Sequence, residues 1–427
     1  MSKFITHIFS IKNHPVCELK DRFKEQYVNG LGEFMCIMFQ SDNQAQFVFN
    51  IWVHSIVKHL KLSYWQKTSN CGYINKALSV KRNGFRFFTM RRNFFFDCLY
   101  LYSILRPMEL SKAFDFLQNQ VGFMSKRTLR HIYKRYLCNN WDNLRQTKVS
   151  PILLNHKEIN ESFQKKPMKK ILVVATMSAG KSTMINAIVG HKICKTAATA
   201  CTSNLCYIYN KPIEDGITFQ ILDGGHVKYI YNRNMKQNDS VKEVGLHFNS
   251  SLTDGNICII DTPGTNYSDD PKHGEITRNA IKSNDYDAII FVVNSINYNS
   301  NDEADLRNYT ICNSQKPIIF VLNKLDCFDP EDDSIQNVVD NLYDVLKRSK
   351  VKPIVVPLSA QYALLLKIVN NGLSKQEQIQ LDRLTQLFKY DYYNLPKYCK
   401  NQQYFNDSNN EIDKTGITIL ENIIRNI

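Results

Sequence analysis

Residues 171–190 read Ile-Leu-Val-Val-Ala-Thr-Met-Ser-Ala-Gly-Lys-Ser-Thr-Met-Ile-Asn-Ala-Ile-Val-Gly. The apolar run at 171–174 predicts a buried strand, and the run at 184–189 predicts the body of a helix. The polar residues between these runs therefore form a loop that leads from the end of a strand directly into a helix. Backbone N–H groups at a helix N-terminus of this kind bind anions, above all phosphate groups.

The loop has the spacing of a phosphate-binding loop, G-x-x-x-x-G-K-[ST], with Ala175 in place of the first glycine. Successive backbone N–H groups in such a loop surround a β-phosphate. Lys181 would add a point charge near the β- and γ-phosphate oxygens, and the Ser182 hydroxyl would bind Mg²⁺. The residues expected to contact the nucleotide in this loop are Ser178, Ala179, Gly180, Lys181, Ser182 and Thr183.

A second motif follows further along the chain. The stretch 256–264 is a buried-strand pattern that ends in D-x-x-G. In phosphoryl-transfer sites with this pattern, the aspartate holds Mg²⁺ through water and the glycine N–H meets the γ-phosphate. Asp261 is therefore the second predicted contact to the metal, and Gly264 is the predicted sensor of the γ-phosphate.

The base is predicted from a third motif, Asn323-Lys324-Leu325-Asp326, which follows the apolar run at 317–322. It stands at the carboxyl end of a predicted parallel strand, where open sheets bind ligands. The Asp326 carboxylate can accept hydrogen bonds from guanine N1–H and from the 2-amino group, and adenine has neither donor. A site built around this carboxylate rejects adenine by roughly 10⁴-fold, because the buried carboxylate would stay unpaired.

A fourth motif, Ser359-Ala360, follows an apolar run at 354–358, and its backbone N–H groups could meet guanine O6. Each of the last three motifs alone is an ordinary turn or loop. Together with the phosphate-binding loop they occur in the right order, each after a predicted strand, with helix-sized segments between them. This order predicts an α/β fold, namely a P-loop GTPase domain with a mostly parallel sheet flanked by helices.

The spacing of the motifs indicates which GTPases the chain resembles. Lys181 and Asp261 are 80 residues apart. Compact GTPases cover this interval in roughly half that length, so the switch region carries extra structure. Two apolar runs within 219–230 predict an added hairpin there. With the Ala-Cys-Thr segment at 200–202, these motifs resemble the GTPase domain of bacterial dynamin-like proteins over residues 168–427.

The resemblance implies roles for further residues. Ser178 matches the loop serine that helps to hold a charge-compensating monovalent cation in that family. Thr202 matches the switch threonine that binds Mg²⁺ and orients the attacking water, with Thr196 and Thr199 as rival candidates. Met177 stands where eukaryotic dynamins carry a water-orienting glutamine, and a thioether cannot orient water as an amide does. The predicted catalytic residues are thus Ser178, Lys181, Thr202 and Gly264, and the predicted metal contacts are Ser182, Thr202 and Asp261.

Charge is distributed unevenly along the chain. The 427 residues have a net charge of +14, but residues 1–170 alone hold 28 Lys and Arg against 11 Asp and Glu. The length also exceeds the usual size of a single core. We therefore expect a basic, aromatic-rich, mostly α-helical accessory domain over 1–155, a polar linker over 156–169 and the GTPase domain over 170–427.

Three interpretations of residues 1–155 stay open. The first is a helical domain with an aromatic core and a solvated basic face. In the second, cations and aromatic rings meet an anionic membrane surface, and in the third they bind nucleic acid. The longest apolar run, 94–105, contains Asp97 and falls well short of the roughly 20 residues of a spanning helix. No secretory signal is evident, so we expect a cytoplasmic protein with reduced thiols, peripheral at the inner face of the membrane under the second interpretation.

The sequence therefore predicts a GTPase that hydrolyses GTP to GDP and phosphate with Mg²⁺. By resemblance, it forms a nucleotide-dependent homodimer and acts at a membrane. The family has stalk helices after the GTPase domain, whereas this chain ends at Ile427. Either the N-terminal domain substitutes for the stalk, a separate stalk-bearing protein supplies it, or the reading frame is truncated. Two other functions stay open: a GTPase switch that binds RNA or ribosomes, and a nucleotide-dependent protein-interaction module with little turnover.

Overall fold

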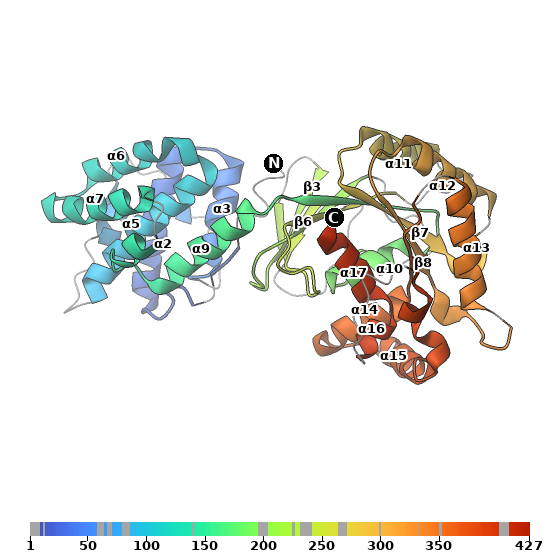
Figure 1. Cartoon of the computed structure of the whole chain (residues 1–427). Coiled ribbons are helices and arrows are strands. Elements are labelled where there is room, and N and C mark those ends of the chain that lie inside the picture. Colours follow the sequence, from blue (N-terminus) through green and yellow to red (C-terminus); the bar gives the residue numbers. More distant parts are fainter. Residues whose placement is uncertain are drawn as a thin grey trace. The chain divides into compact units, whose positions relative to one another are not determined.

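The computed structural model divides the chain into two compact units, Met1–Lys165 and Lys166–Ile427 (Figure 1). The structure describes residues 9–11, 13–57, 64–65, 71–78, 86–138, 141–194, 204–223, 227–230, 241–263, 271–298, 300–332, 334–349, 352–400 and 410–427.

The first unit consists of packed helices, in agreement with the expected helical fold. Its core is aromatic, and the rings of Trp52, Phe94, Phe95, Phe96 and Tyr100 are almost completely buried. Many of the aromatic residues in its sequence are therefore core residues. The helices are α2 (Asp21–Phe39), α3 (Asn43–His54), α4 (Gly72–Leu78), α5 (Arg86–Leu105), α6 (Leu110–Gln120), α7 (Phe123–Leu137), α8 (Trp141–Arg145) and α9 (Pro151–Lys165), with a 3₁₀ turn, η2 (Pro107–Glu109), before α6.

The linker expected over 156–169 differs from the structure, because residues 156–165 lie in α9. Several polar side chains of this segment, namely those of His156, Lys157 and Asn160, are buried in the helix. Asn160 Nδ2 donates to Tyr100 Oη at 2.9 Å, and Lys157 pairs with Glu161. Polar residues that hydrogen-bond inside a core look the same in a sequence as polar residues in solvent. The boundary between the units therefore falls later, after residue 165.

The apolar run 94–105 lies within α5 and packs inside this unit. Asp97, which interrupts the run, is fully buried, and its Oδ2 accepts hydrogen bonds from Tyr27 Oη (2.6 Å) and His14 Nε2 (3.0 Å). Burial of this charge in the run is thus offset by two hydrogen bonds. In the part of the chain that the structure describes, no helix is both long enough and apolar enough to cross a membrane.

His156 of α9 makes the stability of the first unit sensitive to acid. The ring is buried, with Nδ1 3.2 Å from Tyr100 Oη and Nε2 3.1 Å from the Phe9 carbonyl oxygen. Burial lowers the pKa of His156 to about 3, whereas an unfolded histidine titrates near pH 6.5. The folded state therefore binds fewer protons than the unfolded state between these pH values. Its contribution to stability is complete above about pH 6.5 and is lost as the pH falls towards about 3.

We expect His156→Gln to remove much of this acid sensitivity, because a glutamine amide can donate to Phe9 and accept from Tyr100 without titrating. The wild type should lose up to about 5 kcal/mol of unfolding free energy between neutral pH and pH ~3 through this one group. Urea unfolding of both proteins across this range, followed by circular dichroism, measures the difference. Equal pH dependence in the two proteins would contradict the assignment.

The second unit is built on a nine-stranded sheet with the order β4-β3-β5-β2-β6-β1-β7-β8-β9. The segment from β6 to β9 is parallel throughout. Its strands are buried on both faces, which is why they are continuous apolar runs in the sequence. The strands are β1 (Lys169–Ala175), β2 (Cys206–Asn210), β3 (Thr218–Leu222), β4 (Val227–Ile230), β5 (Val241–Leu246), β6 (Ile257–Asp261), β7 (Ala288–Asn294), β8 (Ile318–Asn323) and β9 (Val355–Pro357).

Strands β2, β3, β4 and β5 lie in the long interval between Lys181 and Asp261. Strand β2 pairs with β6 in antiparallel orientation, and β5 pairs with β2 in parallel. Strands β3 and β4 form an antiparallel pair within the segment where the sequence predicts a hairpin. The extra residues of the switch region therefore widen the sheet by β2–β5 on the side of β6.

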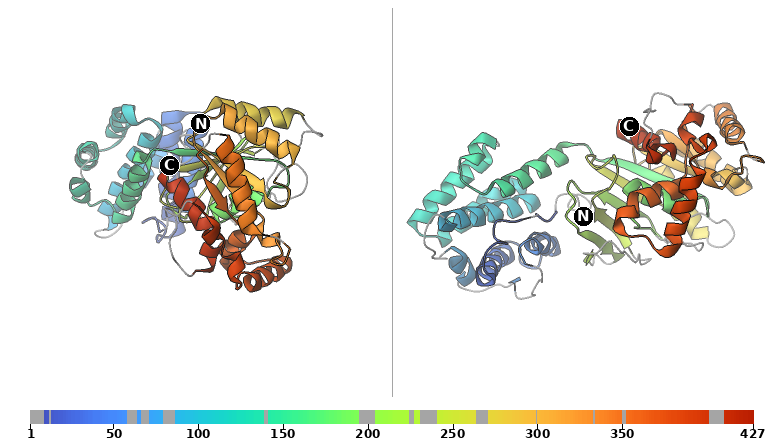
Figure 2. Two further views of the ribbon diagram at one scale, coloured as in Figure 1. Left: turned by 45° about the vertical axis from the view of Figure 1, so that its right-hand side comes forward. Right: turned by 90° about the horizontal axis from the view of Figure 1, so that it is seen from below.

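Helices cover both faces of the parallel strands (Figures 1 and 2). Helices α10, α14 and α17 lie on one face, and α11, α12 and α13 lie on the other. Helix α15 begins with a capping box between Ser374 and Glu377. The helices are α10 (Lys181–Val189), α11 (Pro271–Ser283), α12 (Asn301–Asn313), α13 (Ile335–Arg348), α14 (Ala360–Ile368), α15 (Lys375–Leu387), α16 (Glu411–Lys414) and α17 (Ile417–Asn426).

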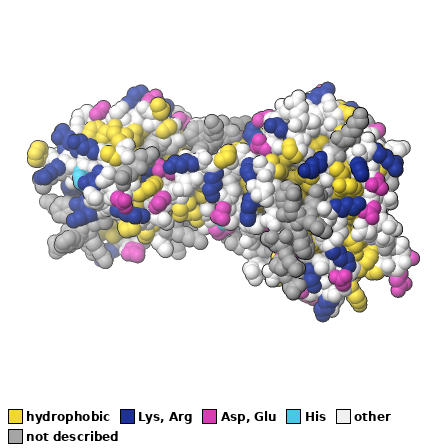
Figure 3. Space-filling model, viewed as in Figure 1, with side chains coloured by type: hydrophobic (Ala, Val, Ile, Leu, Met, Phe, Trp, Pro, Cys, Tyr) yellow, Lys and Arg dark blue, Asp and Glu magenta, His cyan; other side chains and the backbone are white. Residues whose placement is uncertain are grey.

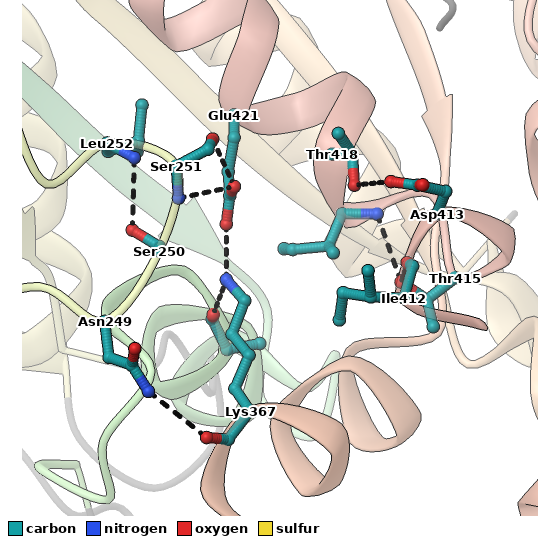
Figure 4. A network of polar contacts seen from close by, with 12 residues as sticks. Asn249, Ser250, Ser251, Leu252, Lys367, Ile412, Asp413, Thr415, Thr418 and Glu421 are labelled. Carbon is teal, nitrogen blue, oxygen red and sulfur yellow. Dashed lines mark hydrogen bonds and ion pairs between the residues drawn. The ribbon is translucent and has the colours of Figure 1, made fainter. Parts of the chain in front are cut away.

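A buried ion pair between Lys367 of α14 and Glu421 of α17 ties three helices together (Figure 4). Lys367 Nζ also donates to the Ala187 carbonyl oxygen of α10 at 2.6 Å. Glu421 Oε2 accepts from Ser251 N at 3.2 Å and from Ser251 Oγ at 2.5 Å. Burial lowers the pKa of Lys367, and the charge of Glu421 opposes that effect. The network fixes α10, the helix that carries Lys181, against α14 and α17.

Glu421→Ala is expected to lower the unfolding free energy by roughly 3–5 kcal/mol, because Lys367 would remain buried without its counter-charge. Chemical denaturation monitored by circular dichroism measures this loss. A double variant, Glu421→Ala with Lys367→Met, removes both charges and should recover much of it. A loss below about 1 kcal/mol in the single variant would mean that the pair contributes little.

Candidate nucleotide-binding site

The predicted phosphate-binding loop joins β1 to α10. Gly180 has a φ of +87°, and a Cβ atom at this position would lie 2.3 Å from Asn323 Nδ2. Both the backbone conformation and the close approach of Asn323 therefore require glycine. Ser178 is an exposed residue with a φ of +62°, a conformation that costs an L-residue roughly 1–2 kcal/mol. Strain of this kind concentrates where a loop serves a function.

Lys181 and Asp261 come together as a buried ion pair at the carboxyl edge of the sheet. Lys181 is the first residue of α10, and Asp261 is the last residue of β6. Their meeting follows from the sheet, because β1 and β6 are neighbours with Val173 opposite Asp261. Thr262 fixes the chain after Asp261, since its Oγ1 donates to the Val173 carbonyl oxygen at 2.8 Å. Lys181, which is predicted to contact the phosphates, and Asp261, which is predicted to hold the metal, thus lie side by side.

The oxygen-bearing side chains beside this ion pair are of the kind that binds Mg²⁺. This ion takes oxygen ligands, and proteins commonly hold it through one or two side chains together with phosphate oxygens and water. Ser182 and Thr183 lie in the first turn of α10, half-buried, with Ser182 directly after Lys181. The Ser182 hydroxyl and the Asp261 carboxylate are donors of the required kind.

Asn323 links the phosphate-binding loop to the fourth motif. Its Nδ2 donates to the Ala179 carbonyl oxygen at 3.0 Å, and its Oδ1 accepts from Ala360 N at 3.1 Å. The side chain is 2% exposed. One amide thus uses both its donor and its acceptor to hold together two loops that lie far apart in the sequence.

The residues predicted to bind the base lie at or shortly after the ends of strands β8 and β9. Lys324 has a φ of +70° and precedes a short 3₁₀ turn that contains Asp326. Ser359 caps α14 by accepting from Tyr362 N at 3.4 Å, and its own N–H donates to the Thr415 carbonyl oxygen at 3.0 Å. The backbone N–H of Ser359 is therefore occupied. The N–H of Ala360 is engaged as well, by Asn323 Oδ1, so either group would have to exchange its present partner to contact guanine O6.

Gly416 follows Thr415, whose carbonyl oxygen accepts from the Ser359 N–H, and its conformation sets the path of this segment. It has a φ of +83°, and a Cβ atom there would lie 2.0 Å from the Pro357 carbonyl oxygen. Only glycine allows the chain before α17 to pass so close to the end of β9.

Two predicted site residues cannot be placed. Thr202, with its rivals Thr196 and Thr199, lies in 195–203, and Gly264 lies in 264–270; both segments are outside the described residues. Their roles stay predictions.

The sequence interpretation missed two residues near Asp261. Cys194 Sγ lies 3.8 Å from Asp261 Oδ2, and burial raises the pKa of its thiol. Asn186 of α10 positions this cysteine, because its Oδ1 accepts from Cys194 N at 2.8 Å and its Nδ2 donates to Cys194 O at 2.9 Å. The available signal in the sequence was Asn186, an asparagine within the apolar run of a helix, since a buried amide needs hydrogen-bond partners.

A parallel sheet whose carboxyl edge gathers these four motifs defines the class of P-loop GTPases, which are GTP hydrolases. Residues 171–325 match the model of the Dynamin family. This part of the chain is a dynamin-type GTPase domain, as its motifs suggested.

Curated relatives of the chain are GTPases. GTPase Era of Histophilus somni is 26% identical over 211 residues, which are 48% of this chain and 55% of the relative. GTPase Era of Haemophilus influenzae is 26% identical over 205 residues. The chain therefore spans about half the length of the curated relatives it matches.

Solved structures with a likeness to the chain include both kinds of protein. A chain of an oligomerised bacterial dynamin pair, described as sensing and tethering membranes, is 15% identical, with a TM-score of 0.37 and coverage of 99% of this chain and 74% of that one. Era of Aquifex aeolicus bound to GDP and AlF₄⁻ is 17% identical, with a TM-score of 0.29 and coverage of 49% and 57%.

Proposed function

We propose that the protein hydrolyses GTP to GDP and phosphate as a dynamin-like GTPase that acts at an anionic membrane surface. The observation that carries the proposal is the meeting of the motifs at one edge of the sheet. Lys181 contacts Asp261, and Asn323 contacts both the phosphate-binding loop and Ala360. The positive charge of the N-terminal unit supports an anionic partner.

Phosphate binding would use Lys181 and the backbone N–H groups of 178–183. The Lys181 ammonium would turn from Asp261 towards the β- and γ-phosphate oxygens, and Ser182 and Asp261 would hold the metal. Mg²⁺ would neutralise charge that develops on the transferring phosphoryl group. Gly264 would sense the γ-phosphate, and Thr202 would hold the metal and orient the attacking water. Ser178 would help to hold a monovalent cation.

Base selection would depend on Asp326. The residue is 7% exposed, and its carboxylate would accept from N1–H and the 2-amino group of guanine. Since Met177 replaces the glutamine that orients water in eukaryotic dynamins, turnover by the isolated protein should be slow and should rise when a partner orders the switch segments. We propose that this order comes from nucleotide-dependent dimerisation at a membrane, with a separate stalk-bearing protein as a further partner.

The test is phosphate release from GTP by the full chain, alone and with vesicles of phosphatidylcholine and phosphatidylglycerol. Stimulation by these vesicles, but not by pure phosphatidylcholine, supports a GTPase that acts at membranes. Stimulation by RNA instead, with steep salt dependence, would assign the protein to the RNA-associated switches. GTP binding without phosphate release under either condition would leave a nucleotide-dependent interaction module.

A further inference from the structure

Helix α7 (Phe123–Leu137) has two faces of different chemistry. It contains five Lys and Arg residues and no Asp or Glu. One face packs into the N-terminal unit through Ser125, Leu129, Ile132 and Tyr136. The opposite face, at spacings of four and three residues, is exposed along the whole helix. We define this α7 outer face as Phe123, Arg127, Arg130, Lys134 and Leu137.

Large apolar side chains stand at both ends of the α7 outer face. Phe123 is 82% exposed at the start of the helix, and Leu137 is 55% exposed at its end. Met108, in η2, is 95% exposed. Helix α6 runs back along α7, with the rings of Phe114 and Tyr133 stacked at 4.1 Å, so that Met108 lies at the same end of this helix pair as Leu137. Packing of the core accounts for none of these three exposures.

The cations between these ends lack counter-charges. In the described part of the chain, no hydrogen bond or ion pair engages the side chain of Arg127 or Lys134, and Arg130 Nε donates to the neutral Gln118 Oε1 at 2.9 Å. Figure 3 shows Lys and Arg side chains gathered, with hydrophobic ones beside them, over the end of the N-terminal unit where Figure 1 labels α6 and α7. Three uncompensated positive charges on one helical face attract an anionic partner.

We propose that the α7 outer face docks on the surface of an anionic phospholipid bilayer. The three cations would meet lipid phosphates, and Phe123, Leu137 and Met108 would reach the boundary between headgroups and acyl chains. Nucleic acid offers phosphates as well, but it has no apolar layer for Leu137 and Met108, and recognition by stacking uses several aromatic rings where this face has one. The inference deepens the proposed membrane role by naming the surface, and it does not depend on GTP turnover.

Vesicle binding by the full chain without nucleotide tests the proposal. The variant Arg127→Gln, Arg130→Gln, Lys134→Gln should bind phosphatidylcholine–phosphatidylglycerol vesicles about 100-fold more weakly, since each cation near an anionic surface contributes roughly fivefold. A matched control, Lys316→Gln, Lys347→Gln, Arg348→Gln, changes the net charge equally on exposed residues of the other unit. It should bind close to wild type.

Phe123→Ser is the second variant, because loss of its apolar ring should weaken vesicle binding about tenfold without any change of charge. Circular dichroism and phosphate release in solution verify that each variant is folded and that its GTPase domain is intact. Vesicle binding by the triple variant equal to that of its matched control would overturn the proposal. Loss of RNA binding in the triple variant, with vesicle binding unchanged, would also overturn it and assign the face to nucleic acid. If the protein binds vesicles through this face but releases no phosphate from GTP, the proposed GTPase function is refuted and the docking proposal still holds.

Discussion

Replacement of Lys181 by alanine is expected to reduce phosphate release from GTP by at least roughly 10²–10³-fold. This is the effect of removing one preorganised charge or donor from a developing anion in a water-poor site. The same change removes the partner of Asp261, whose side chain is 1% exposed. A buried carboxylate without its cation costs about 3 kcal/mol or more. Lys181→Ala should therefore lower the melting temperature as well as the rate.

A double variant separates the two effects. Lys181→Ala with Asp261→Asn removes the unpaired charge and should recover much of the stability, whereas phosphate release should stay as low as in the single variant. Urea unfolding and phosphate release, each measured on the wild type, both single variants and the double variant, complete the cycle. Turnover by Lys181→Ala within about threefold of wild type would exclude Lys181 from phosphate binding, since the predicted loss is far larger.

Asp326→Asn is expected to weaken GTP binding by up to roughly 10⁴-fold and to change the preferred base. The asparagine amide would donate to the exocyclic position where guanine also has a donor, and the two N–H groups would oppose each other. Xanthine carries a carbonyl oxygen at that position, while its N1–H is unchanged. The variant should therefore bind xanthosine triphosphate better than GTP, which competition with a fluorescent guanine nucleotide measures.

The matched control for this experiment is Asp332→Asn, the same chemical change on an exposed aspartate a few residues further along the chain. It should leave both affinities unchanged. If Asp326→Asn binds the two nucleotides in the wild-type order, the base is held by other residues, and the assignment of Asp326 is wrong.

Local patterns in the sequence were sufficient for the core of the GTPase fold. Strands buried on both faces must be apolar throughout, so β1, β6, β8 and β9 could be located from their composition, with the motif residues at or just after their ends. The capping box before α15 was equally readable, because Ser374 and Glu377 satisfy each other's backbone N–H groups within one turn. The fold class and the order of the motifs follow from such short-range rules.

The buried polar contacts of the site could not be located from these rules. Asn323 and Ala179 are separated by 144 positions, and the Lys181–Asp261 pair depends on β1 and β6 being neighbours. Asn160 of α9, within the segment that looked like a linker, is polar and buried because its partner Tyr100 comes from another helix. Sequence records which groups need a partner, but it does not record which distant group supplies one.

The sequence by itself predicted a phosphate-binding loop, an aspartate that would hold metal and a motif that would select guanine, each at the end of a strand, since each pattern is written within a few residues. Only the tertiary structure decided that Asn323 joins two loops, that Ser359 N–H is already occupied by Thr415, and which face of α7 is exposed. The physical reason is that hydrogen bonding and burial are settled between segments distant in the chain, after the sheet and helices have packed.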